Sequence, residues 1–197
     1  MRSKVSTFTG DARRTQIVEC AIETIAATGF AQASIRKIAD RVGIAMSAVL
    51  YHFGSRDKLV TAVVEHMYRT ALAVVVPAMD AESTATAKLN AYIRASIEYF
   101  DTHRAYLVAL TQLPPLGELK LDDEITAQLA ALDPTSILRS GQESGEFDDF
   151  PVDSVALALR GAVNAAVERI LADPEFDTLR YSEDLADAFG RIVTVRQ

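Results

Sequence analysis

The side chains best suited to bind another molecule are concentrated in residues 34–58 of the 197-residue chain. This segment combines cations with neutral hydrogen-bond donors: Ser34, Arg36, Lys37, Tyr51, His52, Arg56 and Lys58. Such groups donate to phosphate oxygens, and an arginine can also donate two parallel bonds to the edge of a guanine. A solvated basic surface would have the same composition, an alternative that applies most to Lys37 and Lys58.

The chain as a whole is acidic, with a formal net charge of −7, but the charge is unevenly distributed. Residues 1–60 contain nine Lys and Arg against five Asp and Glu, a net charge of +4. Residues 61–197 contain eleven against twenty-two, a net charge of −11. A basic segment joined to an acidic one favours a polyanionic partner for the basic segment, although ordinary fluctuation of composition also produces such asymmetry.

No arrangement of residues favours catalysis or metal binding. The motif Gly141–Gly145 has its serine at the fourth position, whereas a nucleophile elbow needs serine at the third position, directly after a strand. The three histidines, His52, His66 and His103, have no Cys, His or carboxylate partners at metal-ligand spacing. We therefore expect no enzymatic activity, no metal and no cofactor.

The sequence also indicates where the protein is found. No uninterrupted apolar run approaches the roughly 20 residues that cross a bilayer, and no apolar segment follows the two basic residues near the N-terminus. The single cysteine, Cys20, cannot form an internal disulfide, which agrees with a reducing compartment. We expect a cytoplasmic protein that does not interact with a membrane.

The elements that must position the candidate residues are helices. Apolar residues recur at helical spacing, and glycine, proline and N-capping residues separate the segments. The predicted helices cover residues 11–28, 34–42, 45–53, 56–76, 84–101, 103–112, 122–141, 153–172 and 182–195. Pro77 is expected to end the fourth helix, and residues 1–10 are expected to form a disordered arm. The sequence therefore predicts an all-α protein.

Two of the short helices have the pattern of a helix-turn-helix. Ala39 allows the following helix to approach closely, and Gly43, four residues later, supplies the tight turn between the two. Ile44 and Val49 then close the apolar contact between the helices. Amphipathic helices joined at a glycine also occur in helical proteins that bind no DNA, so the pattern alone leaves both interpretations open.

The residues around this pair resemble a known family. The run from Gly43 to Leu59, Gly-Ile-Ala-Met-Ser-Ala-Val-Leu-Tyr-His-Phe-Gly-Ser-Arg-Asp-Lys-Leu, resembles the recognition-helix signature of the tetracycline-repressor (TetR) family. In that signature a stretch rich in Tyr and His ends in Phe and precedes a helix start of the Ser-Lys-Glu-x-Leu type. Upstream, Thr28-Gly29-Phe30 and then Ser34–Ala39 follow the family's order and spacing. The resemblance covers residues 17–59 and is weak beyond them.

Three positions depart from the family pattern. Ala45 stands where a serine is frequent and would cap the recognition helix. Ser47 stands where glycine is frequent, and Leu50 stands where the family usually has tyrosine. These departures leave the operator sequence undefined.

The resemblance implies a three-helix helix-turn-helix domain in residues 1–58 and a larger helical domain in residues 59–197 that dimerises and binds a ligand. By this correspondence Met46, Ser47 and Ala48 reach base edges in the major groove of double-stranded operator DNA. Arg36 is the best candidate for a guanine contact. The other polar residues are expected to contact phosphates: Ser34, Lys37, Tyr51, His52, Arg56 and Lys58.

The last two long helices each carry an apolar stripe that could hold two copies together. The stripes consist of Val155, Leu159, Ala162, Val163, Ala166 and Ile170, and of Leu185, Ala188, Phe189 and Ile192. The family resemblance implies that they form a four-helix homodimer interface about a two-fold axis. An intramolecular helix pair would give the same pattern.

Polar aromatic residues and one polar stripe are candidates for an effector pocket. The aromatic residues are Tyr68, Tyr92, Tyr99 and Tyr106, and the stripe is Arg160, Asn164 and Glu168, spaced four residues apart. Core packing for the tyrosines and a solvated face for the stripe are the simpler interpretations.

Taken together, these features predict a DNA-binding transcriptional regulator. We expect a repressor that binds a palindromic operator as a dimer and is released by a small-molecule effector, whose identity remains open. The alternative is a helical protein that binds a small molecule or a partner through its larger domain and whose DNA-binding head is degenerate, because Ala45 and Leu50 depart from the family.

Overall fold

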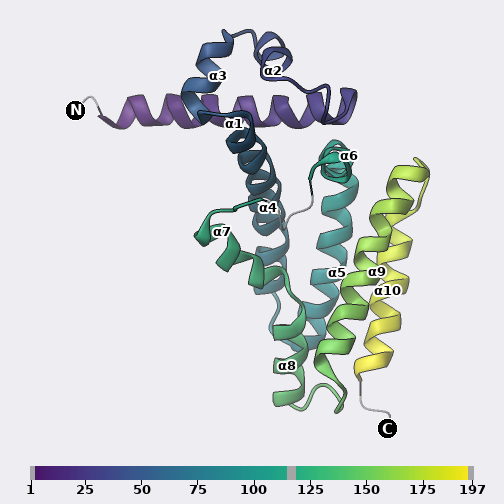
Figure 1. Ribbon diagram of the computed structural model, residues 1–197. Coiled ribbons are helices and arrows are strands. Elements are labelled where there is room, and N and C mark those ends of the chain that lie inside the picture. The colour runs from purple at the N-terminus through teal and green to yellow at the C-terminus, as the bar shows by residue number, and fades with distance from the viewer. Residues whose placement is uncertain (1–2, 115–118, 195–197) are drawn as a thin grey trace. The chain divides into compact units, whose positions relative to one another are not determined.

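The computed structural model describes residues 3–114 and 119–194, which form helices and connecting loops (Figure 1). The helices are α1 (Ser3–Thr28), α2 (Ile35–Val42), α3 (Met46–Phe53), α4 (Arg56–Asp80), α5 (Ala85–Thr102), α6 (Arg104–Gln112), α7 (Asp123–Gln128), α8 (Thr135–Glu143), α9 (Val152–Ala172) and α10 (Thr178–Val193), with a 3₁₀ segment, η2 (Leu129–Leu132). Within this described part the only β pairing is an isolated bridge between Phe147 and Thr194. The all-α prediction is confirmed.

Local capping chemistry sets the helix boundaries around the candidate residues. The Ser34 hydroxyl accepts a hydrogen bond from the Lys37 amide at 3.2 Å, which begins α2, and Ser55 accepts from the Lys58 amide at 3.2 Å, which begins α4. Gly43 ends α2 with φ at 75°, a left-handed conformation that favours glycine. These three predicted boundaries are confirmed.

Two boundaries differ from the sequence prediction because a proline acts differently in each place. α4 continues through Pro77 to Asp80, and the Pro77 carbonyl accepts from the Ala81 amide at 3.1 Å. A proline lacks only its own N–H donor, so buried Val75 and Met79 can hold the final turn in place. The single helix expected over residues 122–141 is instead divided into α7, η2 and α8, with the break before Pro134.

The N-terminal end of the chain also differs from the expectation. α1 begins at Ser3, so residues 3–10 lie in a helix where a disordered arm was expected. No proline interrupts this stretch, and a single glycine, Gly10, costs a helix only about 1 kcal/mol.

The chain divides into two compact units. Unit 1 comprises residues 1–67 and 105–122, so α6 and the start of α4 belong with the N-terminal helices. It is therefore larger than the segment 1–58 expected from the sequence. Its core is a cluster built on α1 that includes Ile17, Ile22 and Val63, each fully buried, together with Ala109 from α6. Burial of this size stabilises a small unit mainly through the hydrophobic effect.

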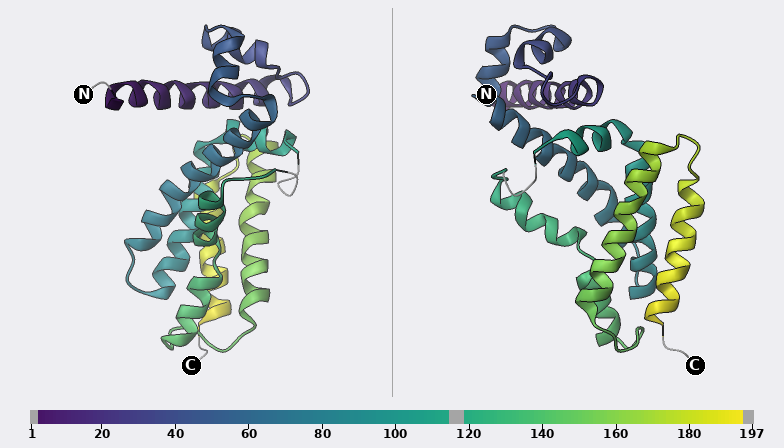
Figure 2. Two further views of the ribbon diagram at one scale, coloured as in Figure 1. Left: turned by 60° about the vertical axis from the view of Figure 1, so that its left-hand side comes forward. Right: turned by 45° about the vertical axis from the view of Figure 1, so that its right-hand side comes forward.

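Unit 2 comprises residues 68–104 and 123–197, in which α5, α9 and α10 run side by side (Figure 2). Leu89 and Ile93 of α5, Leu159 of α9 and Val193 of α10 are all fully buried. The Glu146 carboxylate, from the loop between α8 and α9, accepts hydrogen bonds from the backbone of Ala85 and Thr86 at 3.0 and 3.1 Å. Unit 2 is thus held by an apolar core and by a carboxylate that caps α5.

α4 has the length and composition of a membrane-crossing helix, the only one among the described residues that does. Its apolar residues Leu59, Val63, Val64 and Met67 are buried within the protein. These are the properties of a core helix, which passes the same test of length and composition.

Candidate nucleic-acid interface

The helix-turn-helix predicted from Ala39 and Gly43 is present in unit 1. α2 and α3 lie side by side next to α1 (Figures 1 and 2). Ala39 and Val49 are buried at their contact, and the Ala39 carbonyl accepts from the Ile44 amide at 3.0 Å. A small residue and a left-handed glycine therefore permit the close packing of two short helices.

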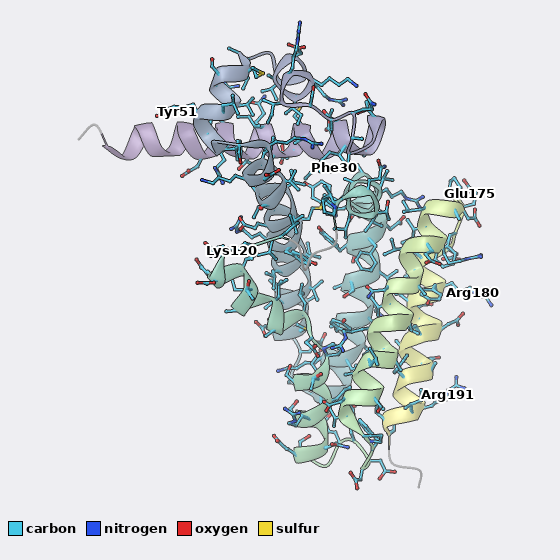
Figure 3. The ribbon with its side chains drawn as sticks, in the orientation of Figure 1. Phe30, Tyr51, Lys120, Glu175, Arg180 and Arg191 are labelled. Atoms are coloured by element: carbon cyan, nitrogen blue, oxygen red, sulfur yellow. The ribbon has the colours of Figure 1, made fainter. Side chains whose placement is uncertain are left out.

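α3 presents an outward face that carries no charge. Tyr51 is 87% exposed, Met46 is 49% exposed and Leu50 is 36% exposed, while Val49 and Phe53 on the opposite face are buried. Figure 3 shows Tyr51 standing out from the helix. Ser47 is exposed as well, and Ala48 is half-buried. Of the base-contacting residues predicted on α3, Met46 and Ser47 are therefore exposed and Ala48 is less accessible.

α3 begins without a side-chain cap. Ala45 occupies the N-cap position and makes no side-chain hydrogen bond to the helix. The serine that would cap this helix in the family is therefore not replaced by a side-chain hydrogen bond from Ala45. The first backbone N–H groups of α3 are thus available to another acceptor.

The cations of the interface come from α2. The Arg36 side chain is 84% exposed and its Nε lies 3.9 Å from an oxygen of Asp40, one turn further along the helix. Lys37 is exposed beside it. A single exposed ion pair of this length restrains a side chain weakly, so Arg36 is free to reorient toward a ligand.

Two residues predicted to contact phosphates, Arg56 and His52, make contacts within the protein that reduce their access to DNA. Arg56 donates to the Phe30 carbonyl at 2.6 Å, and its guanidinium carbon lies 4.3 Å from the centroid of the Phe30 ring. The His52 side chain is half-buried between the Tyr51 and Phe53 rings, with ring centroids 5.5 and 6.4 Å away. Lys58 remains exposed. Arg56 therefore fixes the loop after α1, a contact that a linear sequence does not reveal.

Sequence reasoning missed Arg14, which supports α3 from α1. Its guanidinium donates to the His52 carbonyl at 2.8 Å and lies 4.4 Å from the centroid of the Phe53 ring. A cation over an aromatic ring at this distance is a favourable contact. The adjacent pair Arg13 and Arg14 on a helix was the available signal, but it does not tell which arginine turns toward α3.

The chain thus combines a unit that carries a helix-turn-helix with a larger, mainly helical unit. Residues 17–63 match the model of bacterial regulatory proteins of the tetR family. The resemblance recognised in the sequence over residues 17–59 is confirmed.

One curated relative matches part of the chain, and two solved structures share its fold. The HTH-type transcriptional regulator BetI of Paraburkholderia phytofirmans is 35% identical over 57 residues, a match that covers 29% of this chain and 29% of that protein. The structure of FadR from Bacillus subtilis in complex with stearoyl-CoA is similar with a TM-score of 0.76 at 20% identity, over 88% of this chain and 95% of that one. KstR2 of Mycobacterium tuberculosis, a ketosteroid transcriptional regulator, is similar with a TM-score of 0.75 at 21% identity, over 93% of this chain and 96% of that one. The match to BetI spans less than a third of the relative, whereas the similarity of fold extends over most of the chain.

The residues expected to form an effector pocket do not share one environment. Tyr92 and Tyr99 are buried in unit 2, where the Tyr99 hydroxyl lies 3.1 Å from that of Thr70. Tyr68 is half-buried in the same unit, whereas Tyr106 belongs to unit 1, where its hydroxyl lies 3.2 Å from His66 Nε2. The four tyrosines therefore lie in two different cores.

The polar stripe of α9 is also divided. Arg160 forms an ion pair with Asp133, whereas Asn164 and Glu168 are exposed. Burial, with the Asp133 carboxylate nearby, raises the pKa of Tyr92 to about 12. Arg160 and Tyr92 thus share one polar region of unit 2, while Asn164 and Glu168 lie on the outer face of the helix.

The residues expected at the dimer interface divide in the same manner. Leu159, Val163, Ala166 and Ile170 are buried in unit 2, as is Phe189 of α10. These side chains face the core of their own chain, which is the intramolecular alternative that the sequence left open. Val155, Ala162 and Leu185 are half-buried, and Ala188 and Ile192 remain exposed.

Proposed function

We propose that the protein is a transcriptional regulator that binds double-stranded operator DNA through α2 and α3. One observation supports this proposal above the others: a helix-turn-helix combines an exposed, uncharged face of α3 with the exposed cations Arg36 and Lys37 of the adjoining helix α2. A helix of this kind enters the major groove, while cations beside it contact phosphates. The net charge of +4 in residues 1–60 favours the same partner.

The proposed contact set follows from the exposure of each side chain. Arg36 reads a base edge, and Lys37, Tyr51 and Lys58 contact phosphates. Ser34 serves first as the cap of α2, since its hydroxyl already accepts from Lys37. Arg56 is left out of this set because its guanidinium is engaged with Phe30.

We further propose that the regulator is a homodimer, because helix-turn-helix proteins that read two half-sites place their recognition helices one DNA turn apart. The outer face of α9 provides a surface for it: Leu157 is 64% exposed, and Gly161 and Ala165 follow at four-residue intervals. Small residues allow the backbones of two helices to approach closely. Ala188 and Ile192 of α10, both exposed, would extend this surface.

An effector would act on unit 2. The proposal draws on the relatives, since one was solved with stearoyl-CoA and another is named a ketosteroid regulator. In this chain the proposed apolar part of the effector site is formed by the buried rings of Tyr92 and Tyr99. Its proposed polar part is the ion pair of Arg160 with Asp133. We propose a cytoplasmic repressor whose dimer has one arrangement that binds DNA and one that does not. A ligand that binds the second arrangement better would release the DNA.

The test is a selection of binding sites from random duplex DNA with the full chain, followed by fluorescence anisotropy. We expect enriched palindromic sites, an affinity that falls steeply with salt, and about a tenfold loss or more for Arg36→Ala. Stearoyl-CoA added to the complex is the first effector to try. Without enrichment and without salt-dependent binding, the alternative of a degenerate DNA-binding head would hold.

A further inference from the structure

The composition of α3 restricts which bases it can distinguish. Residues 46–53 read Met-Ser-Ala-Val-Leu-Tyr-His-Phe, with no Lys, Arg, Asn, Gln, Asp or Glu among them. Those six residue types form the paired hydrogen bonds to guanine and adenine or accept from the amino group of cytosine. α3 therefore lacks the residues that read guanine or adenine through paired hydrogen bonds or accept from cytosine, and the exposed Ser47 can form single hydrogen bonds only.

α3 also exposes two large apolar side chains, Met46 and Leu50. Met46 and Leu50 are four residues apart, which places them one turn apart on the same face of the helix. They are 49% and 36% exposed, while Val49 and Phe53 fill the core behind them. The sulfur and carbon atoms of this pair give the outward face of α3 an apolar part.

The surroundings of this apolar part indicate its partner. Arg36 and Lys37 are exposed on the neighbouring helix, and residues 1–60 carry a net charge of +4. Cations beside an apolar patch complement duplex DNA, whose phosphates flank the groove. In the major groove the C5-methyl group of thymine is the apolar group that a base edge offers.

We propose that Met46 and Leu50 read thymine methyl groups, so that each half-site carries thymine at the base pairs under α3. This inference rests on the proposed function. Arg36 of α2 then supplies the hydrogen-bonded readout, and α3 supplies apolar readout. Leu50, which departs from the family's usual tyrosine, becomes a determinant of operator sequence.

The experiment removes the methyl groups without altering the hydrogen-bonding edge of any base. The full chain selects sites from random duplex DNA, and each thymine of the enriched half-site is then replaced in turn by deoxyuridine. At one or two positions per half-site we expect a loss of affinity of about fourfold for each methyl, because burial of one such group contributes about 0.8 kcal/mol. Anisotropy at constant salt measures the loss.

Two variants assign the contacts. Leu50→Ala should bind the selected site more weakly and lose its sensitivity to deoxyuridine at one position, and Met46→Ala should do so at another. Alanine is compatible with both exposed helical positions, so the fold is retained. Leu110→Ala is the matched control, since Leu110 is 38% exposed on α6 of the same unit and should leave both affinity and sensitivity unchanged.

The outcomes separate this inference from the function on which it rests. Enriched sites that bind equally well with thymine and with deoxyuridine at every position would overturn the methyl readout and leave the regulator intact. Sensitivity to deoxyuridine that persists in both variants would also overturn it. Failure to enrich any site would instead overturn the proposed function.

Discussion

Exposed apolar side chains on α3 and on α9 lie in parts of the chain that carry opposite net charge. Met46 and Leu50 of α3 belong to residues 1–60, with a net charge of +4, and the adjoining helix α2 exposes the cations Arg36 and Lys37. Leu157 of α9 belongs to the acidic remainder of the chain, residues 61–197, with a net charge of −11. We expect a binding site on both helices, and the opposite net charge favours nucleic acid as the partner of α3 and protein as the partner of α9.

α10, which packs with α9 in unit 2, carries two exposed ion pairs. Arg180 lies 3.8 Å from Asp184, and Arg191 lies 4.0 Å from Asp187, all on α10. Figure 3 shows Arg180 and Arg191 standing out from this helix. Arg36 forms an equally exposed pair with Asp40, so ion pairing does not distinguish the two surfaces, whereas the sign of the net charge in residues 1–60 and 61–197 does.

The largest expected effect is the loss of stability from a glutamate on the buried face of α9, compared with a glutamate at the adjacent residue on the outer face. Ala166 is fully buried, so Ala166→Glu places a carboxylate in the core and should reduce the free energy of unfolding by about 3 kcal/mol or more. Ala165 is exposed, so Ala165→Glu should unfold at nearly the wild-type temperature yet give monomers in light scattering and weak operator binding. Ala127→Glu, on the exposed side of α7, is the control. A dimeric Ala165→Glu variant with normal DNA binding would place the interface elsewhere.

Two arginines of unit 1 should show opposite behaviour. Arg56→Ala removes a charged hydrogen bond to Phe30 and should lower the free energy of unfolding by about 1–2 kcal/mol. Arg36→Ala should leave stability within about 0.5 kcal/mol but lower the free energy of operator binding by about 1–3 kcal/mol. Urea unfolding and anisotropy measure the two quantities. If the stability loss belonged to Arg36 and the specific DNA loss to Arg56, the assignment of these residues would be reversed.

The smallest effect depends on pH and concerns the cap of α5. Hydrogen bonds from the backbone of Ala85 and Thr86 lower the pKa of Glu146 from its ordinary value of 4.5. The stabilisation that the charged Glu146 carboxylate gives the folded protein is therefore complete above its ordinary pKa and is lost as the pH falls through its lower pKa in the folded state. We expect Glu146→Gln to melt below the wild type near neutral pH, with a difference that shrinks on acidification. Glu143→Gln, at an exposed position of α8, should show no such convergence; a difference independent of pH would contradict the assignment.

The sequence predicted the helix-turn-helix well because short-range chemistry determines it. Ser34, Gly43 and Ser55 act on the backbone within a few residues of themselves, so their effects can be read without knowing the rest of the fold. The same short-range chemistry sets the start of α10, although the sequence prediction missed it. Asp177 caps that helix by accepting from the Arg180 amide at 2.9 Å, and the prediction began the helix at Ser182 instead.

What the sequence could not supply is the identity of the surface that covers an apolar stripe. The periodicity of Leu159, Val163 and Ala166 defines one face of a helix, but the same pattern suits contact with α5 of the same chain or with a second copy. Arg56 presents the same difficulty, since its contact with Phe30 joins residues 26 positions apart. Contacts of this kind depend on the tertiary arrangement and not on local spacing.

The most direct test of the account is backbone hydrogen exchange of the full chain with and without a selected duplex. Contact with DNA should slow exchange in α2 and α3, residues 35–53, because these amides become less accessible and their helices open less often. The outer face of α9 should respond instead to protein concentration, as dimers form. Slower exchange on addition of DNA that is confined to α9 and α10, with none in α2 and α3, would contradict the assignment of the DNA-binding surface.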